Sequence, residues 1–119
     1  RTALKWFNNS YEEVKVENKV LELDIAFQSM FKCDRYDHLI KSKLISVDLY
    51  EIERIYKELF NLKRQRNLIA HQGLSSLKPD KLESIIANAE EIFRKYYKWF
   101  LEQIDKGKDY YEIIGKHRR

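Results

Sequence analysis

Residues that interrupt regular structure are scarce in this chain of 119 residues. It holds three glycines and one proline, and the dipeptides Asn-Gly and Asp-Gly, which favour hairpin turns, do not occur. A sheet of many short strands needs such turns at short intervals, so the sequence lacks the means to build one. We therefore expect an all-α fold, an up-and-down bundle of about four to five helices.

Cysteine and long apolar runs are also scarce. The single cysteine, Cys33, excludes an internal disulfide and fits a reducing compartment. No apolar run approaches the ~20 residues that a membrane span needs, and the first residues show no signal-peptide pattern. We expect a cytoplasmic location and no membrane partner. The chain begins with Arg1 rather than methionine, so we also expect it to be part of a longer protein.

Length, composition and charge set limits on domain number and partners. With 44% hydrophobic and 13% aromatic residues, the chain can bury one core, and we expect a single domain over residues 1–119. The net charge is +4, but Lys116, Arg118 and Arg119, in a basic tail over residues 116–119, supply three of these charges. Charge alone is therefore a weak argument for a nucleic-acid partner.

Two helices are predicted in the first third of the chain. A lead-in helix over Thr2–Phe7, within residues 1–9, should end at the two asparagines that follow. Ser10 and Glu13 then have the S-x-x-E spacing of a capping box, so a second helix should run over about residues 11–32. Its apolar residues recur at steps of three and four, which predicts a buried stripe of Val16, Val20, Leu23, Phe27, Met30 and Phe31.

Two polar residues interrupt the apolar surface of that second helix. Asp24 lies between Val20 and Phe27, and Gln28 continues a flanking apolar line. An unpartnered polar group on a buried face costs roughly 1–3 kcal/mol, so each side chain should have a hydrogen-bond partner. Each is either an ordinary core polar residue with its partners or the support of a site.

Further helices are predicted in the rest of the chain. One short helix is expected over residues 39–44, with His38 facing solvent. A long helix should start at Asp48, and another should span about residues 79–104. A last turn is expected over residues 109–114. Three apolar residues lie off the stripe of the helix over 79–104, and we favour packing over base stacking for them: Tyr97, Trp99 and Leu101.

The long helix in the middle of the chain changes its pattern near its end. Up to Leu62 its apolar residues lie on one side of a wheel that advances ~100° per residue, with Gln65 on the polar side. Continuing the wheel places Lys63, Arg66 and Asn67 inside the apolar sector. A guanidinium aimed at a core or an interface must be paired or must bind an anion, and such breaks in pattern occur most often at functional sites.

This break falls in the stretch R-N-L-I-A-H, residues 66–71. Arg66 and His71 are five residues apart, so on a straight helix they diverge by ~140° and do not face one phosphate. Gly73 predicts that the helix stops near His71 in a left-handed cap, which would free the histidine to turn. A second copy of the chain is another way to complete a site. A plainer explanation is that both residues cap carbonyls and complement the helix dipole.

Motifs for metal or nucleotide chemistry are absent from the sequence. It has no Cys/His pair with zinc spacing, no glycine-rich phosphate loop, no H-E-x-x-H and no G-x-S-x-G. We therefore expect no metal and no cofactor. What remains is His71, because imidazole accepts and donates protons near neutral pH, beside cations that hold phosphate. These groups suit metal-independent phosphodiester transfer in RNA, in which the 2′-hydroxyl is the nucleophile.

A long amphipathic helix, then R-N-x-x-A-H, then Gln-Gly and another long helix together resemble the HEPN superfamily (higher eukaryote and prokaryote nucleotide-binding). The signature of that family is Arg, a short spacer and His, often with Asn directly after the Arg. The matching residues in this chain are Arg66, Asn67 and His71. The resemblance implies a helical bundle that forms a homodimer, with the two motifs meeting at the interface.

The resemblance also implies an activity, that of an endoribonuclease leaving 2′,3′-cyclic phosphate and 5′-hydroxyl ends. His71 would act as general acid and base, Arg66 would bind the scissile phosphate, and Asn67 would orient the pair. Lys63 and Arg64 would hold flanking phosphates, with an affinity that falls as salt rises. By analogy with bacterial members, the biological role would be that of a toxin or an antiviral (phage-defence) effector.

Many members of the family also carry an acidic residue on the helix packed against the motif. Asp24 would fill that role, while Gln28 stands where some branches have an acid. The expected partners are RNA, a second copy of the chain, and an antitoxin or fused regulatory domain. Two alternatives stay open: a non-catalytic HEPN bundle that binds a nucleotide or a protein, and an unrelated helical interaction module.

Overall fold

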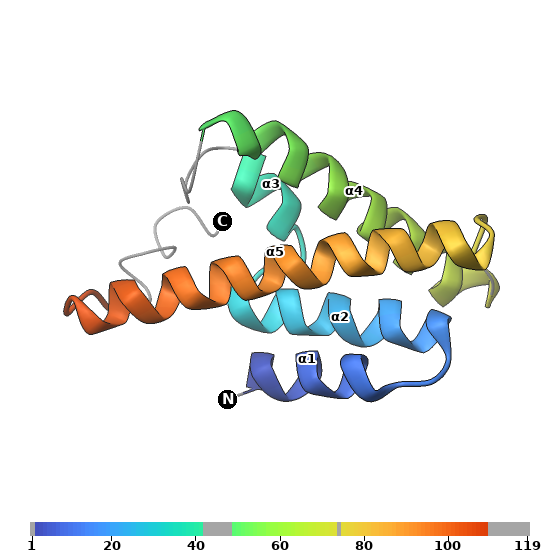
Figure 1. The fold of residues 1–119 in the computed structure, drawn as a ribbon, viewed down its shortest axis with the longest axis horizontal. Coiled ribbons are helices and arrows are strands. Elements are labelled where there is room, and N and C mark those ends of the chain that lie inside the picture. The colour runs from blue at the N-terminus through green and yellow to red at the C-terminus, as the bar shows by residue number, and fades with distance from the viewer. Residues whose placement is uncertain (1, 42–48, 74, 110–119) are drawn as a thin grey trace.

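The fold is a bundle of helices. A computed structural model of the chain describes residues 2–41, 49–73 and 75–109, and no strand occurs within these ranges. The four long helices run in alternating directions, which confirms the all-α, up-and-down bundle (Figure 1). None of the described helices combines the length and the apolar content that crossing a bilayer requires. The helices are α1 (Thr2–Glu12), α2 (Val16–Phe31), α3 (Tyr36–Lys41), α4 (Leu49–Gln72) and α5 (Pro79–Asp105).

Helix α2 is the centre of the bundle, since it packs against α1, α4 and α5 and also touches α3. The predicted stripe explains this position, because apolar side chains on most of its circumference can be buried only by several neighbours at once. Its buried apolar residues are Val20, Leu23, Ala26, Phe27, Met30 and Phe31. Any polar side chain on these faces is therefore enclosed by other helices.

Aromatic rings join α2 to α3 and α5. The Phe27 ring lies 5.0 Å from the Tyr36 ring and 5.4 Å from the Phe93 ring, measured between centroids. The Phe31 ring lies 5.5 Å from both Tyr96 and Phe100. Such pairs contribute about 0.5–1.5 kcal/mol each beyond the burial of their area. Tyr36 thus fixes the short helix α3 on α2, with its hydroxyl inside the bundle.

The prediction that α1 ends at the asparagines is wrong. The helix continues through Asn8 and Asn9, and the Ser10 hydroxyl, buried, donates to the carbonyl of Phe7 at 2.7 Å instead of capping a new helix. The Phe7 ring explains the difference, because it stacks on Phe93 of α5 with centroids 4.3 Å apart. Burial of this face of α1 outweighs the weak local preference of asparagine and serine for turns.

The predicted capping box is also wrong, and α2 begins at Val16 rather than near residue 11. Glu13 turns the chain instead: its carboxylate accepts from the backbone amides of Val14 and Lys15, at 3.0 and 3.3 Å. The acid thus caps the connection between α1 and α2 rather than the start of a helix at Ser10.

The remaining elements agree closely with expectation. Helix α3 begins three residues before the predicted short helix and covers its residues 39–41, whereas residues 42–44 lie outside the described ranges. Helix α4 starts directly after Asp48, itself outside the described part, and α5 ends one residue beyond the prediction. Residues 110–119, with most of the predicted last turn and the basic tail, are also not described. Two of the off-stripe aromatics pack on the core as favoured, Tyr97 against Phe93 and Trp99 against Phe100.

Replacement of Phe7 tests whether α1 belongs to the cooperative fold. Phe7→Ala should lower the free energy of unfolding by about 3–5 kcal/mol, because a buried, stacked ring is replaced by a cavity. Urea unfolding followed by circular dichroism measures the change. Val14→Ala is the control, at a side chain that is 91% exposed, and should change stability by less than about 0.5 kcal/mol. Equal stability of Phe7→Ala and the unmodified chain would show that α1 does not stabilise the bundle.

Candidate functional site

The site is built around the carboxylate of Asp24, which lies on α2 and is fully buried. Its Oδ1 accepts hydrogen bonds from the Tyr36 hydroxyl at 2.6 Å and from the Lys63 ammonium at 3.1 Å. Its Oδ2 accepts from the Gln28 amide at 2.6 Å and lies 3.3 Å from Nε of Arg66. A buried carboxylate is tolerated only with such partners, and here they come from α2, α3 and α4.

Asp24 explains why the apolar pattern of α4 breaks. The side chains of Lys63 and Arg66 point into the apolar sector because the carboxylate of α2 lies beneath them. The Lys63 side chain is only 13% exposed and its ammonium also lies 5.0 Å from the centre of the Tyr36 ring, whereas the Arg66 side chain is 36% exposed. The partners expected for Asp24 and Gln28 are therefore present, and two cations share one carboxylate.

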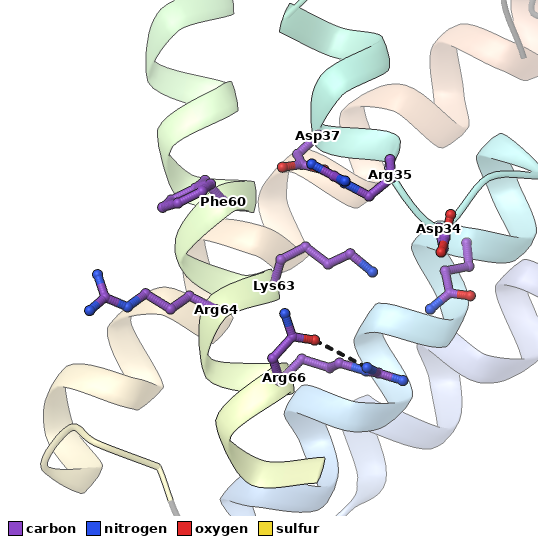
Figure 2. A pocket seen from close by; sticks show the side chains of 9 residues that line it. Asp34, Arg35, Asp37, Phe60, Lys63, Arg64 and Arg66 are labelled. Atoms are coloured by element: carbon purple, nitrogen blue, oxygen red, sulfur yellow. Dashed lines mark hydrogen bonds between the residues drawn. The ribbon is translucent and has the colours of Figure 1, made fainter. Parts of the chain in front are cut away.

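An open pocket of about 550 Å³ lies beside this cluster, between α4 and the segment that leads into α3 (Figure 2). Four cationic side chains and two carboxylates are among the residues that line it. A concave surface with excess positive charge favours an anionic ligand. The lining residues are Gln28, Asp34, Arg35, Asp37, Phe60, Lys63, Arg64, Arg66 and Asn67.

The predicted motif residues occupy different positions around the pocket. Arg66 donates from Nη1 to the side-chain oxygen of Asn67 at 3.1 Å, the bond drawn in Figure 2. Asn67 thus orients the guanidinium from the outside while Asp24 holds it from the inside. Of the two predicted phosphate-binding residues, Lys63 points toward α2, whereas Arg64 points away from the cluster (Figure 2).

His71 lies outside the pocket. Helix α4 continues through Gln72, and Gly73, with φ +78°, follows it and donates to the carbonyl of Ile69 at 2.8 Å. The predicted stop at His71 is therefore one residue too early, and the histidine stays in the last helical turn, exposed. Because the helix is unbroken, His71 and Arg66 diverge by ~140°. A single chain does not bring these two side chains together.

The prediction that Gln65 lies on the polar side of α4 is wrong. The side chain is 4% exposed and continues the buried line between Leu62 and Ile69. Its carbonyl oxygen accepts from the Ser75 hydroxyl at 2.5 Å and from the Ser76 amide at 3.2 Å. Gln65 therefore anchors the loop that follows α4. Gln65 follows the buried Leu62 by three residues, and this helical spacing was the signal in the sequence that Gln65 is buried.

Tyr36 and Asp37 are components of the site that the sequence did not reveal. Both are buried, at 0% and 2% exposure, within a charged stretch that has no helical period of its own. Burial raises the pKa of the Tyr36 phenol well above its usual range, and the charge of Asp24 raises it further. Tyr36 thus stays a neutral hydrogen-bond donor. His38 next to them is exposed, as predicted, and hydrogen-bonds Arg35.

Comparison with known proteins adds no assignment, since no family model, curated protein or solved structure matches the chain. Within the described ranges, no group of three or more His, Cys, Asp or Glu side chains lies close enough together to hold a metal ion. The site is defined by its own contacts: a buried carboxylate, two cations that it orients, and a basic pocket beside them.

Removal of the Tyr36 hydroxyl tests the hydrogen bond to Asp24. Tyr36→Phe should lower the free energy of unfolding at neutral pH by about 1.5–3 kcal/mol, the range for a bond to a charged group. Tyr11→Phe removes a hydroxyl from a side chain that is 57% exposed and should have no effect. Urea unfolding of both variants measures the difference, and equal stabilities would show that Tyr36 does not hold Asp24.

Tyr36→Phe should also change how the free energy of unfolding falls at alkaline pH. Tyrosine in the unfolded chain ionises near pH 10, whereas the raised pKa keeps folded Tyr36 protonated above that pH. The folded state then binds more protons, so stability is full below pH about 10 and falls as the pH rises further. Unfolding measured in steps up to about pH 11 should show a smaller fall for Tyr36→Phe than for the unmodified chain.

Proposed function

We propose that this domain is a metal-independent endoribonuclease that cleaves RNA to 2′,3′-cyclic phosphate and 5′-hydroxyl ends. The observation that carries the proposal is the guanidinium of Arg66, which Asp24 and Asn67 hold at the edge of a basic, open pocket. An arginine fixed in this way is suited to a phosphodiester, because its orientation does not have to be gained on binding. By analogy with ribonucleases of the HEPN type, the role would be that of a toxin or defence effector.

The reaction needs proton transfer and charge stabilisation. The 2′-oxygen of the substrate attacks the adjacent phosphorus and loses its proton to a base, the P–O5′ bond breaks, and the leaving 5′-oxygen takes up a proton. His71 is proposed to move these protons, since imidazole can do so near neutral pH. Arg66 is proposed to stabilise the extra negative charge on the phosphoryl oxygens. Lys63 and Arg64 would contact phosphates on either side.

A homodimer is part of the proposal, because Arg66 and His71 of one chain do not face one phosphate. If α4 of one copy packs against α4 of another, the His71 of one chain can approach the Arg66 of its partner. The exposure of His71 and Asn67 supports such an arrangement. An antitoxin or a fused regulatory domain would act by blocking or arranging this face.

One observation favours a second candidate, a helical module that binds RNA, a nucleotide or a protein without cleaving it. His71 does not line the pocket, although Asp34 and Asp37 do, so the cationic site could hold a phosphate with no imidazole beside it. The two candidates share the pocket and differ in whether His71 takes part.

Cleavage by single variants separates these candidates. The purified chain should cut single-stranded RNA in EDTA, and its products should end in cyclic phosphate by end-group analysis. His71→Ala should slow cleavage by about 10²–10⁴-fold, the usual contribution of a general acid or base, and should keep its fold because the side chain is exposed. Arg66→Ala should also lose activity, whereas Lys98→Ala, which removes an exposed cation of α5, should not.

One outcome would contradict the proposed ribonuclease activity. RNA that binds to the folded, dimeric chain in a salt-dependent way but is never cut would favour the binding module. Cleavage that survives His71→Ala would remove that residue from the mechanism.

Mixing two inactive variants tests the shared site. Arg66→Ala and His71→Ala homodimers should each be inactive, but a mixed dimer combines the intact Arg66 of one chain with the intact His71 of the other. If subunits exchange freely, about a quarter of the normal activity should return, because half of the dimers are mixed and each has one intact site. No recovery, with subunit exchange verified by tagged copies, would show that the site is not built in this way.

A further inference from the structure

One wall of the pocket is aromatic. Phe60 is the one apolar side chain among the described residues that line it, and it is 45% exposed. Phe60, Lys63 and Asn67 follow one another at steps of three and four, so they share one face of α4. The Tyr56 ring lies 6.0 Å from the Phe60 ring and supports it from the preceding turn. An exposed ring among cations is the usual platform for a base of single-stranded nucleic acid.

The opposite side of the pocket carries an unfilled acceptor. Asp37, at the start of α3, also lines the pocket and is 2% exposed. Its Oδ1 has no hydrogen-bond partner in the part of the chain that the structure describes, and its Oδ2 lies 3.8 Å from Nε2 of His38, beyond hydrogen-bond distance. A buried carboxylate without donors costs stability; because Oδ1 is also closed to solvent, a ligand would supply these donors by displacing the side chains that cover it.

We propose that this pocket holds one nucleobase next to the phosphate bound at Arg66, stacked on Phe60, and that Asp37 selects guanine. The inference rests on the proposed function, since it takes RNA as the ligand of this face. A pocket of about 550 Å³ is large enough for a nucleoside. The surrounding cations would hold the phosphates that flank the base.

The choice of guanine as the selected base follows from the geometry of the Asp37 carboxylate. Its two oxygens can accept two adjacent donors, and on the Watson–Crick edge only guanine offers a pair, N1–H and N2–H. Adenine and cytosine place an acceptor beside their amino group, and uracil places carbonyls on both sides of its single N–H. These acceptors would face a negative charge. Single strands are read on this edge because their bases are not paired.

The test is binding of short uridine oligonucleotides with one central guanosine, inosine or adenosine. Inosine is the matched control, because it differs from guanosine only in lacking the N2 amino group. Fluorescence anisotropy is measured on the full chain carrying His71→Ala, so that the RNA stays intact. The guanosine RNA should bind roughly tenfold more tightly than the inosine or adenosine RNA.

Two substitutions assign the preference to the named residues. Asp37→Asn should bring guanosine and inosine affinities together without weakening adenosine binding, since a carboxamide offers one acceptor and one donor instead of two acceptors, a pair that matches adenine. Phe60→Leu should weaken all three RNAs roughly tenfold, whereas Phe60→Tyr, which keeps the ring, should not. Circular dichroism confirms folding, and if Asp37→Asn does not fold, the comparison with inosine decides alone.

Each contrary outcome would overturn a defined part of this proposal. Equal affinity for the three RNAs excludes guanine selection, and a preference that survives Asp37→Asn excludes the role of Asp37. If Phe60→Leu changes the oligomeric state in sedimentation but not the RNA affinity, Phe60 is a contact between copies and not a base platform. Cleavage without base preference would overturn this inference and leave the ribonuclease intact. Guanine-selective binding without cleavage would support it and overturn the ribonuclease.

Discussion

A single buried carboxylate determines how the polar side chains of three helices are arranged. Asp24 has no access to solvent, and its two oxygens are shared among a phenol, an amide, an ammonium and a guanidinium. Removing the carboxylate would leave two cations without their partner, which commonly costs several kcal/mol. Asp24 and the cations of α4 therefore require one another, and α3 is included because Tyr36 donates to the same carboxylate.

The regularity of α4 places the two motif residues in different environments. At ~100° per residue, Arg66 turns toward α2 while His71, five positions later, turns away. The glycine that ends the helix comes after Gln72, too late to redirect the histidine. One chain thus presents a held cation and an exposed imidazole on separate faces. This separation, rather than the motif alone, is why a second copy of the chain enters the proposal.

The sequence predicted the parts of the fold that depend on helical period. The long helices follow from their apolar stripes, and the break in the stripe of α4 correctly pointed to Lys63 and Arg66 as side chains with a special environment. The errors have a common cause, since local signals were given weight where tertiary burial decides. Ser10 matches a cap but lies inside α1, a helix that Phe7 holds on the core, and Gln65 has the character of a polar surface residue but binds a loop.

The helical period of the sequence could not identify Tyr36 and Asp37 as site residues. They lie in a helix of six residues, too short for a period to be read, and their roles depend on contacts with α2 and α4 that are distant in sequence. No local rule states that a tyrosine between an arginine and an aspartate will be buried. Their contribution appears only once the helices are packed.

The plain explanation, that Arg66 and His71 only cap the end of a helix, fits one of them. His71 lies in the last turn, where a basic group complements the helix dipole. Arg66 instead is bound to Asp24 and Asn67, and among the described residues no backbone carbonyl accepts from it. Two cations also share the one carboxylate, and a structural ion pair would need only one of them. The cluster therefore carries one positive charge in excess, and the open basic pocket lies beside it, which favours an anionic ligand there.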